Sequence, residues 1–134
     1  MREVDDAEVT MTEDHEYLHE GAPFTGVAVE SRDGHRLCET HYEDGMRHGL
    51  RRRWYPGGAL VWTEERFHQN CAHGLSQEWY ESGLLRRETQ FEMGHVLFST
   101  SWDQSGEVEE EYTLSESDPA YRLLQLSRVA YPAP

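Results

Sequence analysis

A phrase that recurs at a nearly fixed spacing constrains the fold of this chain more than any other feature. Residues 49–60 read GLRRRWYPGGAL, residues 74–85 read GLSQEWYESGLL, and residues 97–108 read LFSTSWDQSGEV. The aligned columns hold Trp54, Trp79 and Trp102; Leu50, Leu75 and Phe98; and Gly58, Gly83 and Gly106. A short period of this kind indicates a supersecondary unit that is stabilised by stacking on its neighbours.

Each unit has the pattern of a β-hairpin. In LSQEW (75–79) apolar and polar residues alternate, which is typical of a strand. YESG (80–83) is a turn signal, and LLRRETQF (84–91) is the returning strand. A weaker first copy occupies residues 26–37. The sequence therefore predicts an all-β fold, an elongated single antiparallel sheet of stacked hairpins with bulges in the second strands.

The alternation sorts the first strands into two faces. One face is an apolar stripe of Val27, Val29, Leu50, Trp54, Leu75, Trp79, Phe98 and Trp102. The other carries Ala28, Glu30, Arg51, Arg53, Tyr55, Ser76, Glu78, Tyr80, Ser99, Ser101 and Asp103. Large apolar residues at a period of two usually pack, so the Trp column is predicted to lie in the core.

The repeats are flanked by two different termini. Residues 1–16 form an acidic segment, expected to be partly disordered or to add an edge strand at EVTM (8–11). Residues 17–114 hold the repeats, and residues 115–134 a capping helix and tail. Asp118 is the expected N-cap and Pro119 the first helical residue. The predicted helical side of Tyr121, Leu124 and Val129 packs on the last hairpin or across the apolar stripe; an uncovered stripe predicts a homodimer.

The repeated pattern, seen in full as GLSQEWYESGLLRRETQFEMGH (74–95), resembles the bacterial MORN-variant repeat. GAPFTGVAV (21–29) is similar to the opening unit of such proteins, and the likeness covers residues 17–113. The resemblance implies a sheet of MORN-type hairpins. It also implies a role like that of bacterial members described as antitoxins or immunity proteins, or of eukaryotic members that bind lipids or act as scaffolds.

The charge of the chain limits its partners. Its 134 residues carry a net charge of −14, which disfavours nucleic acid and anionic membranes as partners. The acidity either favours a basic protein partner or only keeps the chain in solution. The two cysteines form no dense disulfide framework, no apolar run approaches the length of a membrane span, and the N-terminus lacks the apolar region of a signal peptide. A cytoplasmic bacterial protein is the expectation.

One cluster on the predicted open face has the composition of a partner surface. Arg51, Arg53 and Tyr55 are expected to stand beside Glu78 and Tyr80. Tyrosine and arginine are enriched where proteins bind one another. The alternative is that the arginines only pair with glutamates on neighbouring strands. We take these five residues as the candidate partner-binding site.

The histidines and cysteines raise a question of chemistry. His35, Cys38 and His41 form one group, and His68, Cys71 and His73 another, with residue types that suit zinc or a nucleophilic pair. Their spacing is poor for a single strand, and whether they converge stays open. The sequence predicts no metal site, no cofactor and no catalytic residue that can be named.

The leading hypothesis is a non-enzymatic protein-binding repeat module, in its specific form an immunity or antitoxin-like protein that neutralises a basic partner. The alternative is a small enzyme or ligand-binding protein of a bacterial biosynthetic pathway, with His, Tyr and Glu residues on the open sheet face. A lipid-binding module is a third hypothesis, which the acidity disfavours.

Overall fold

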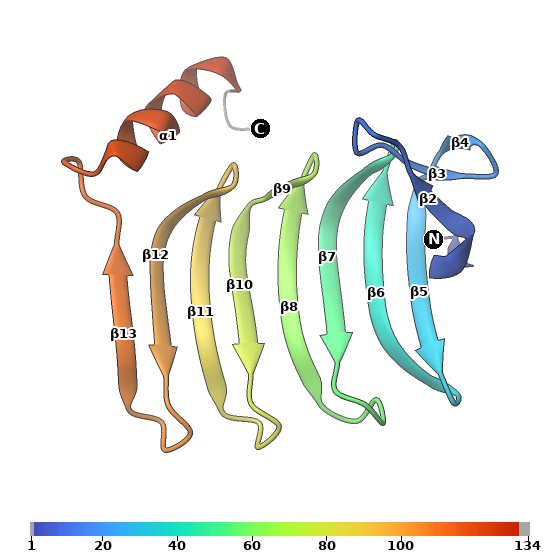
Figure 1. Ribbon diagram of the computed structural model, residues 1–134, viewed down its shortest axis with the longest axis horizontal. Coiled ribbons are helices and arrows are strands. Elements are labelled where there is room, and N and C mark those ends of the chain that lie inside the picture. Colours follow the sequence, from blue (N-terminus) through green and yellow to red (C-terminus); the bar gives the residue numbers. More distant parts are fainter. Residues whose placement is uncertain (1, 132–134) are drawn as a thin grey trace.

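The computed structural model describes residues 2–131, which are mostly β-structure (Figure 1). They form a large open mixed sheet of ten strands, a small three-stranded sheet and one C-terminal helix. The strands of the large sheet, in spatial order, are β1 (Glu3–Asp5), β5 (Gly26–Arg32), β6 (His35–Glu43), β7 (Met46–Trp54), β8 (Val61–His68), β10 (Gly74–Trp79), β11 (Leu85–Glu92), β12 (His95–Trp102) and β13 (Val108–Thr113), with β9 (Cys71–Ala72) paired to β8.

The predicted hairpins are confirmed, because β5 to β13 lie side by side in sequence order and every neighbouring pair is antiparallel. The predicted bulges are also present as register shifts, for example between Arg53 and Trp54 and between Glu78 and Trp79. The prediction of one wholly antiparallel sheet was wrong at the N-terminal edge. There β1 runs parallel to β5, and the chain adds a second sheet.

The N-terminal segment is more structured than its acidity predicted. After β1 the chain forms a short 3-10 helix, η1 (Asp6–Glu8), held by a capping box between Asp5 and Glu8. The small sheet follows, with β2 (Val9–Met11), β3 (Tyr17–His19) and β4 (Ala22–Pro23) in that spatial order. The last three residues of EVTM therefore supply the edge strand that was expected, but at the edge of the small sheet.

The two ends of the hairpins use different turns. At the joint end, which we define by residues 44–45, 69–70 and 93–94, both central residues of each two-residue turn have positive φ. This is the type I′ geometry that matches the twist of an antiparallel pair. At the opposite end, the Trp end, the chain returns after Trp54, Trp79 and Trp102 through longer turns. Gly58, Gly83 and Gly106 occupy the positive-φ position of those turns.

Repeated hydrogen bonds fasten each hairpin to the next one. At the joint end the residue before each leading glycine accepts a bond from a backbone N–H of the following turn. Thr25 Oγ1 accepts from Asp44 at 2.9 Å, His48 Nδ1 from Gln69 at 3.4 Å, and His73 Nδ1 from Met93 at 3.1 Å. At the Trp end the hydroxyl of Tyr55 donates to the carbonyl of Trp79 at 2.6 Å, and that of Tyr80 to Trp102 at 2.8 Å.

The best-buried cluster lies at the N-terminal end of the large sheet. Phe24, Ala28 and Tyr42 form it, and Val4, Val9 and Tyr17 pack around it. Burial raises the pKa of Tyr42 to about 12, with smaller contributions from neighbouring groups. This cluster joins the small sheet to the large one, since its side chains come from both.

The prediction of a core under the Trp column was wrong. Trp54, Trp79 and Trp102 are only half-buried, and Phe98 on the same face is 43% exposed. Their partial burial comes from neighbours within the sheet, since these tryptophans stand directly opposite Val61, Leu85 and Val108. In a single-layered sheet, cross-strand pairs of this kind take the place of a second layer.

The C-terminal helix, α1 (Pro119–Ala130), begins as predicted, with Asp118 accepting a hydrogen bond from the N–H of Ala120 at 2.9 Å. It lies at the joint end of β11, β12 and β13 (Figure 1). It does not lie across the face that carries the Trp column, which we call the Trp face. Leu124 is its buried residue, at 1% exposure. Val129 is 82% exposed, so its predicted place on the packed side was wrong. Within residues 2–131 no helix is long and apolar enough to cross a membrane.

Candidate functional site: the groove face

One face of the large sheet has a floor of small polar side chains. Directly opposite residues share a face, so the register places Ala28, Thr40, Arg51 and Glu65 in one row. The neighbouring row runs through Cys38, Arg53, Thr63, Glu78, Arg87, Ser101 and Glu110. With Ser76, Thr89, Ser99 and Tyr112 these residues define the groove face. Thr40, Thr63 and Thr89 are its most buried members, with exposures of 5–7%.

Four of the five predicted site residues come together at the Trp end of this face. The guanidinium of Arg53 lies 4.5 Å from the ring centre of Trp62, and the ring centre of Tyr55 lies 5.9 Å from it. The indole N–H of Trp62 donates to Glu78 Oε2 at 3.3 Å. Arg86 lies 3.6 Å from the same Glu78 oxygen and stacks over Tyr80 at 5.4 Å. We call these six residues the aromatic cluster.

The fifth predicted residue, Arg51, stands apart from the aromatic cluster. It lies on the groove face between Thr40 and Glu65. Burial lowers the pKa of its guanidinium, but contacts with Cys38, Glu65 and Tyr42 outweigh this effect and leave the pKa raised. Among the described residues its Nε atom is buried without a hydrogen-bond partner. Arg51 is therefore charged and only partly compensated.

The alternative, in which these arginines pair with glutamates on neighbouring strands, is confirmed for Arg52 and Arg53. Arg53 Nη2 lies 3.3 Å from Glu65 Oε1 on the groove face. On the opposite face Arg52 lies between Glu39, at 3.9 Å, and Glu64, at 3.1 Å. The RRRWY segment thus has a structural role, and its middle arginine points away from the groove.

The two predicted tyrosines use their hydroxyls inside the protein, in the bonds to Trp79 and Trp102 described above. What Tyr55 offers to a partner is its ring. Burial is the main cause of the raised pKa of the Tyr55 hydroxyl, and Glu81 and Glu78 add to it. This hydroxyl stays protonated at neutral pH and acts as a donor.

Two hollows lie on either side of the Tyr55–Trp62 pair. One, of about 500 Å³, is lined by Cys38, Arg51 and Arg53 among others. The other, of about 620 Å³, is lined by Tyr80, Glu81 and Arg86. Both hollows include Tyr55 and Trp62 in their walls, so the two rings form a ridge between them. A ridge of aromatic rings with flanking charges is typical of an interface hot spot.

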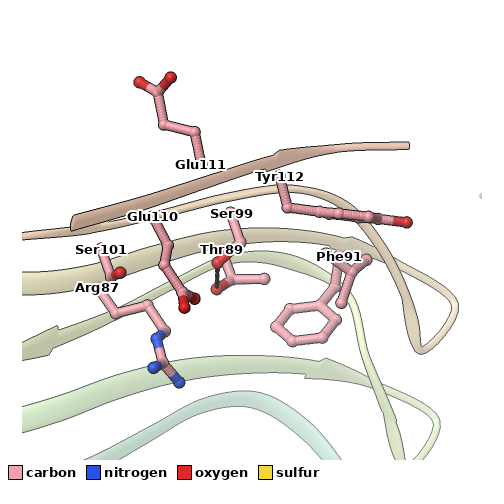
Figure 2. Close-up of a pocket in the computed structure, with 9 residues that line it drawn as sticks. Arg87, Thr89, Phe91, Ser99, Ser101, Glu110, Glu111 and Tyr112 are labelled. Carbon is pink, nitrogen blue, oxygen red and sulfur yellow. Dashed lines mark hydrogen bonds between the residues drawn. The ribbon is translucent and has the colours of Figure 1, made fainter. Parts of the chain in front are cut away.

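A third hollow, of about 570 Å³, lies between β11 and β13 (Figure 2). Arg87 and Glu110 point into the same space at one end, whereas Phe91 and Tyr112 lie at the other. Between them the hydroxyls of Thr89 and Ser99 share a hydrogen bond of 2.9 Å on the floor. Glu111 points away from this space, as alternation along the strand requires. The groove face therefore has hollows in two regions, beside the Tyr55–Trp62 pair and over the strands from β11 to β13.

Sequence reasoning missed Trp62, Arg86, Arg87 and Glu110. All four lie on the second strands of their hairpins, whose faces depend on turn length. The turn from Tyr55 to Leu60 is one residue longer than the turn from Tyr80 to Leu84, as their closing hydrogen bonds show. Residues at the same distance in sequence from the glycine column therefore lie on different faces of the sheet in different repeats. Counting the insertion in PGGA would have aligned Trp62 with Arg86.

The histidines and cysteines of the two candidate groups do not form a metal centre. Cys38 lies on the groove face, whereas His41 lies opposite Val27 on the other face. His68 and His73 lie near one another, with ring centres 5.8 Å apart, but Cys71 is exposed. Over residues 2–131 no group of three or more His, Cys, Asp or Glu side chains is arranged to hold a metal ion.

The likeness of this chain to known proteins was tested in three ways. A scan against protein-family models, a search of curated proteins and a search of solved structures each found no match.

Proposed function

We propose that this chain is a non-enzymatic protein-binding module built from MORN-like hairpin repeats, and that it holds a basic partner protein on the groove face. The observation that carries the proposal is the groove face itself, an uncovered sheet surface hollowed in two regions and bearing the aromatic cluster. Tyrosine, tryptophan and arginine are the residues that most often dominate protein interfaces.

The distribution of charge supports a basic partner. Residues 1–31 contain nine carboxylates and one arginine, and residues 88–134 contain nine and two. Residues 32–87 contain eight carboxylates and nine arginines. The two ends of the large sheet are therefore acidic, while its centre is close to neutral. Acidic regions of this kind accelerate encounter with a basic protein, and the central cluster can then supply short-range contacts.

The resemblance to the MORN-variant repeat gives the proposal its specific form, an immunity or antitoxin-like protein. In this form the bound partner is a basic toxin or enzyme whose activity is lost in the complex. The enzyme alternative, with His, Tyr and Glu residues acting on the sheet face, has less support. His48 and His73 use Nδ1 to accept hydrogen bonds from turns, and they lie at the joint end, away from the aromatic cluster.

The test is affinity capture from a lysate of the encoding organism at low and high salt, followed by mass spectrometry and purification of the captured protein. We expect a stoichiometric basic partner that high salt releases. Ser101→Trp should abolish binding, because it fills the groove floor. Thr100→Trp is the matched control, since Thr100 neighbours Ser101 but faces the opposite side.

Three outcomes would count against the proposal. The first is capture of no partner in either condition, which would make the enzyme alternative the better hypothesis. The second is equal binding by the Ser101→Trp and Thr100→Trp proteins, which would place the partner elsewhere. The third is a partner that salt does not release, which would remove the role of the acidic ends.

A further inference from the structure

A hollow larger than those of the groove face lies away from the aromatic cluster, at the joint end of the repeats. It has a volume of about 920 Å³, within the range of small-molecule sites. Its walls come from β8, β11 and β12 and from the end of α1, which lies at the joint end of β11, β12 and β13 (Figure 1). Nothing in the proposed binding of a protein partner uses this space.

The hollow exists because the last repeat departs from the pattern of the others. In the earlier repeats Thr25, His48 and His73 each accept a hydrogen bond from the next turn. The equivalent residue of the last repeat is Val96, which is apolar and has no further hairpin turn beside it, and Leu97 stands where the earlier repeats have their leading glycine. Instead α1 takes the place of the next unit, and Leu97 becomes part of the wall.

Two contacts hold α1 in this position. Arg128 makes a bidentate pair with Glu92, with distances of 2.6 and 2.9 Å. Ser127 Oγ lies 2.9 Å from His95 Nε2. Both contacts are in the last third of the helix, beside the hollow. The wall that α1 provides is therefore fixed by specific contacts to β11 and β12.

The hollow has one apolar part and one part rich in hydrogen-bond donors. Phe91, Met93, Leu97, Ala130 and Tyr131 supply the apolar surface. His68, Gln69, His73, Gln90 and Arg128 supply the donors. A ligand with an apolar body and a polar head would match both parts.

The imidazoles of His68 and His73 indicate which charge the polar head of a matching ligand would carry. Because His73 Nδ1 accepts the N–H of Met93, the neutral ring carries its proton on Nε2, which has no acceptor among residues 2–131. His68 makes only stacking contacts there, to His48 at 5.0 Å and His73 at 5.8 Å. Glu92, the one carboxylate in the described wall, is already neutralised by Arg128. In a chain this acidic, the hollow is a place where donors outnumber acceptors.

We infer that this hollow is a binding site for a small amphipathic carboxylate. Its carboxylate accepts hydrogen bonds from His68 and His73, and its apolar body packs between Phe91, Leu97 and Tyr131. The site shares only the Phe91 ring with the hollow between β11 and β13, and it requires no protein partner.

The test uses a matched pair of probes, 4-phenylbutyrate and 4-phenylbutylamine, which share an apolar body and differ in the charge of the head. In amide NMR spectra we expect 4-phenylbutyrate to shift signals from residues 68–73, 90–97 and 127–131, and the amine to leave them unchanged. Ala130→Trp fills the hollow and should abolish these shifts.

His68→Leu should weaken binding by about tenfold or more, since a hydrogen bond to a charged group contributes roughly 1.5–3 kcal/mol. His35→Leu is the control, because His35 is exposed at the Trp end. Equal binding of both probes, shifts spread over the Trp face, or unchanged affinity of both the Ala130→Trp and His68→Leu proteins would overturn the inference.

Discussion

The tyrosine that follows the repeated tryptophan is the clearest residue-scale link between sequence and fold. Its hydroxyl reaches the carbonyl of the next tryptophan, at Tyr55 and again at Tyr80. In the last repeat Asp103 takes this place and instead accepts hydrogen bonds from Ser105 and Glu107 within its own turn. The ladder of tyrosines therefore stops where no further hairpin follows.

Tyr80→Phe tests this ladder. Removing the hydroxyl leaves the carbonyl of Trp102 without its donor, so we expect the free energy of unfolding to fall by about 1 kcal/mol. Urea denaturation followed by tryptophan fluorescence measures it. Tyr131→Phe is the control, because Tyr131 is 63% exposed. A loss of the same size in both variants would refute the role of the ladder.

Met93 has a backbone conformation that is unfavourable for its residue type. It has φ 50° in the first central position of a type I′ turn, a conformation that Asp or Asn adopts more easily. We expect Met93→Asn to stabilise the protein by about 0.5–1 kcal/mol. A rise in the thermal midpoint measures the gain. Gly94→Ala, at φ 82°, should lower it, and a Met93→Asn protein less stable than the parent would contradict this account.

At the scale of elements, the end of α1 is held to β11 by a charged pair. The hydrogen bond from Arg128 is the main cause of the lowered pKa of Glu92, which lies below its ordinary value of 4.5. A carboxylate with a depressed pKa adds stability above its unfolded pKa, and this stability is lost as the pH falls through the folded pKa. Docking of α1 should therefore be constant near neutral pH and weaken below about pH 4.5.

Hydrogen exchange of the α1 amides, measured by mass spectrometry between pH 3.5 and 6.5 and corrected for intrinsic rates, checks this prediction. Glu92→Gln should remove most of the pH dependence, because the amide cannot titrate. Glu116→Gln, in the exposed turn before the helix, is the matched control and should keep the dependence. Equal pH dependence in the parent and the Glu92→Gln protein would show that another group is responsible.

Elements were more predictable from the sequence than faces were. The Trp and Gly columns located the hairpins, and Asp118–Pro119 located the start of α1, because turn and cap geometries depend on local residue types. The packing of Val129 and the face of Trp62 were not predictable in the same way. The first depends on where α1 docks, and the second on one inserted residue in a turn. For the same reason the aromatic cluster was found only in part.

At the scale of the whole molecule, the sheet has a second uncovered face, which lies opposite the groove face. Because α1 lies at the joint end, nothing in residues 2–131 covers the face that carries Trp54, Trp79, Trp102 and Phe98. Apolar rows on this face alternate with the charged row of Glu39, Arg52 and Glu64. Two copies placed face to face could bury the apolar rows and align the charged ones, so we expect a homodimer at tens of micromolar concentration.

Light scattering and sedimentation velocity over a range of concentrations measure this association. Phe98→Glu should shift the protein to a monomer, because it places a charge on the exposed apolar surface of the face that carries the tryptophans. Tyr131→Glu adds the same charge at another exposed aromatic residue, away from that face, and should leave the dimer intact.

A parent protein that stays monomeric would show that cross-strand packing alone is sufficient to stabilise the tryptophans. A dimer that survives Phe98→Glu would place the contact at another surface, such as the edge strand β13, whose glutamates 109–111 are all exposed.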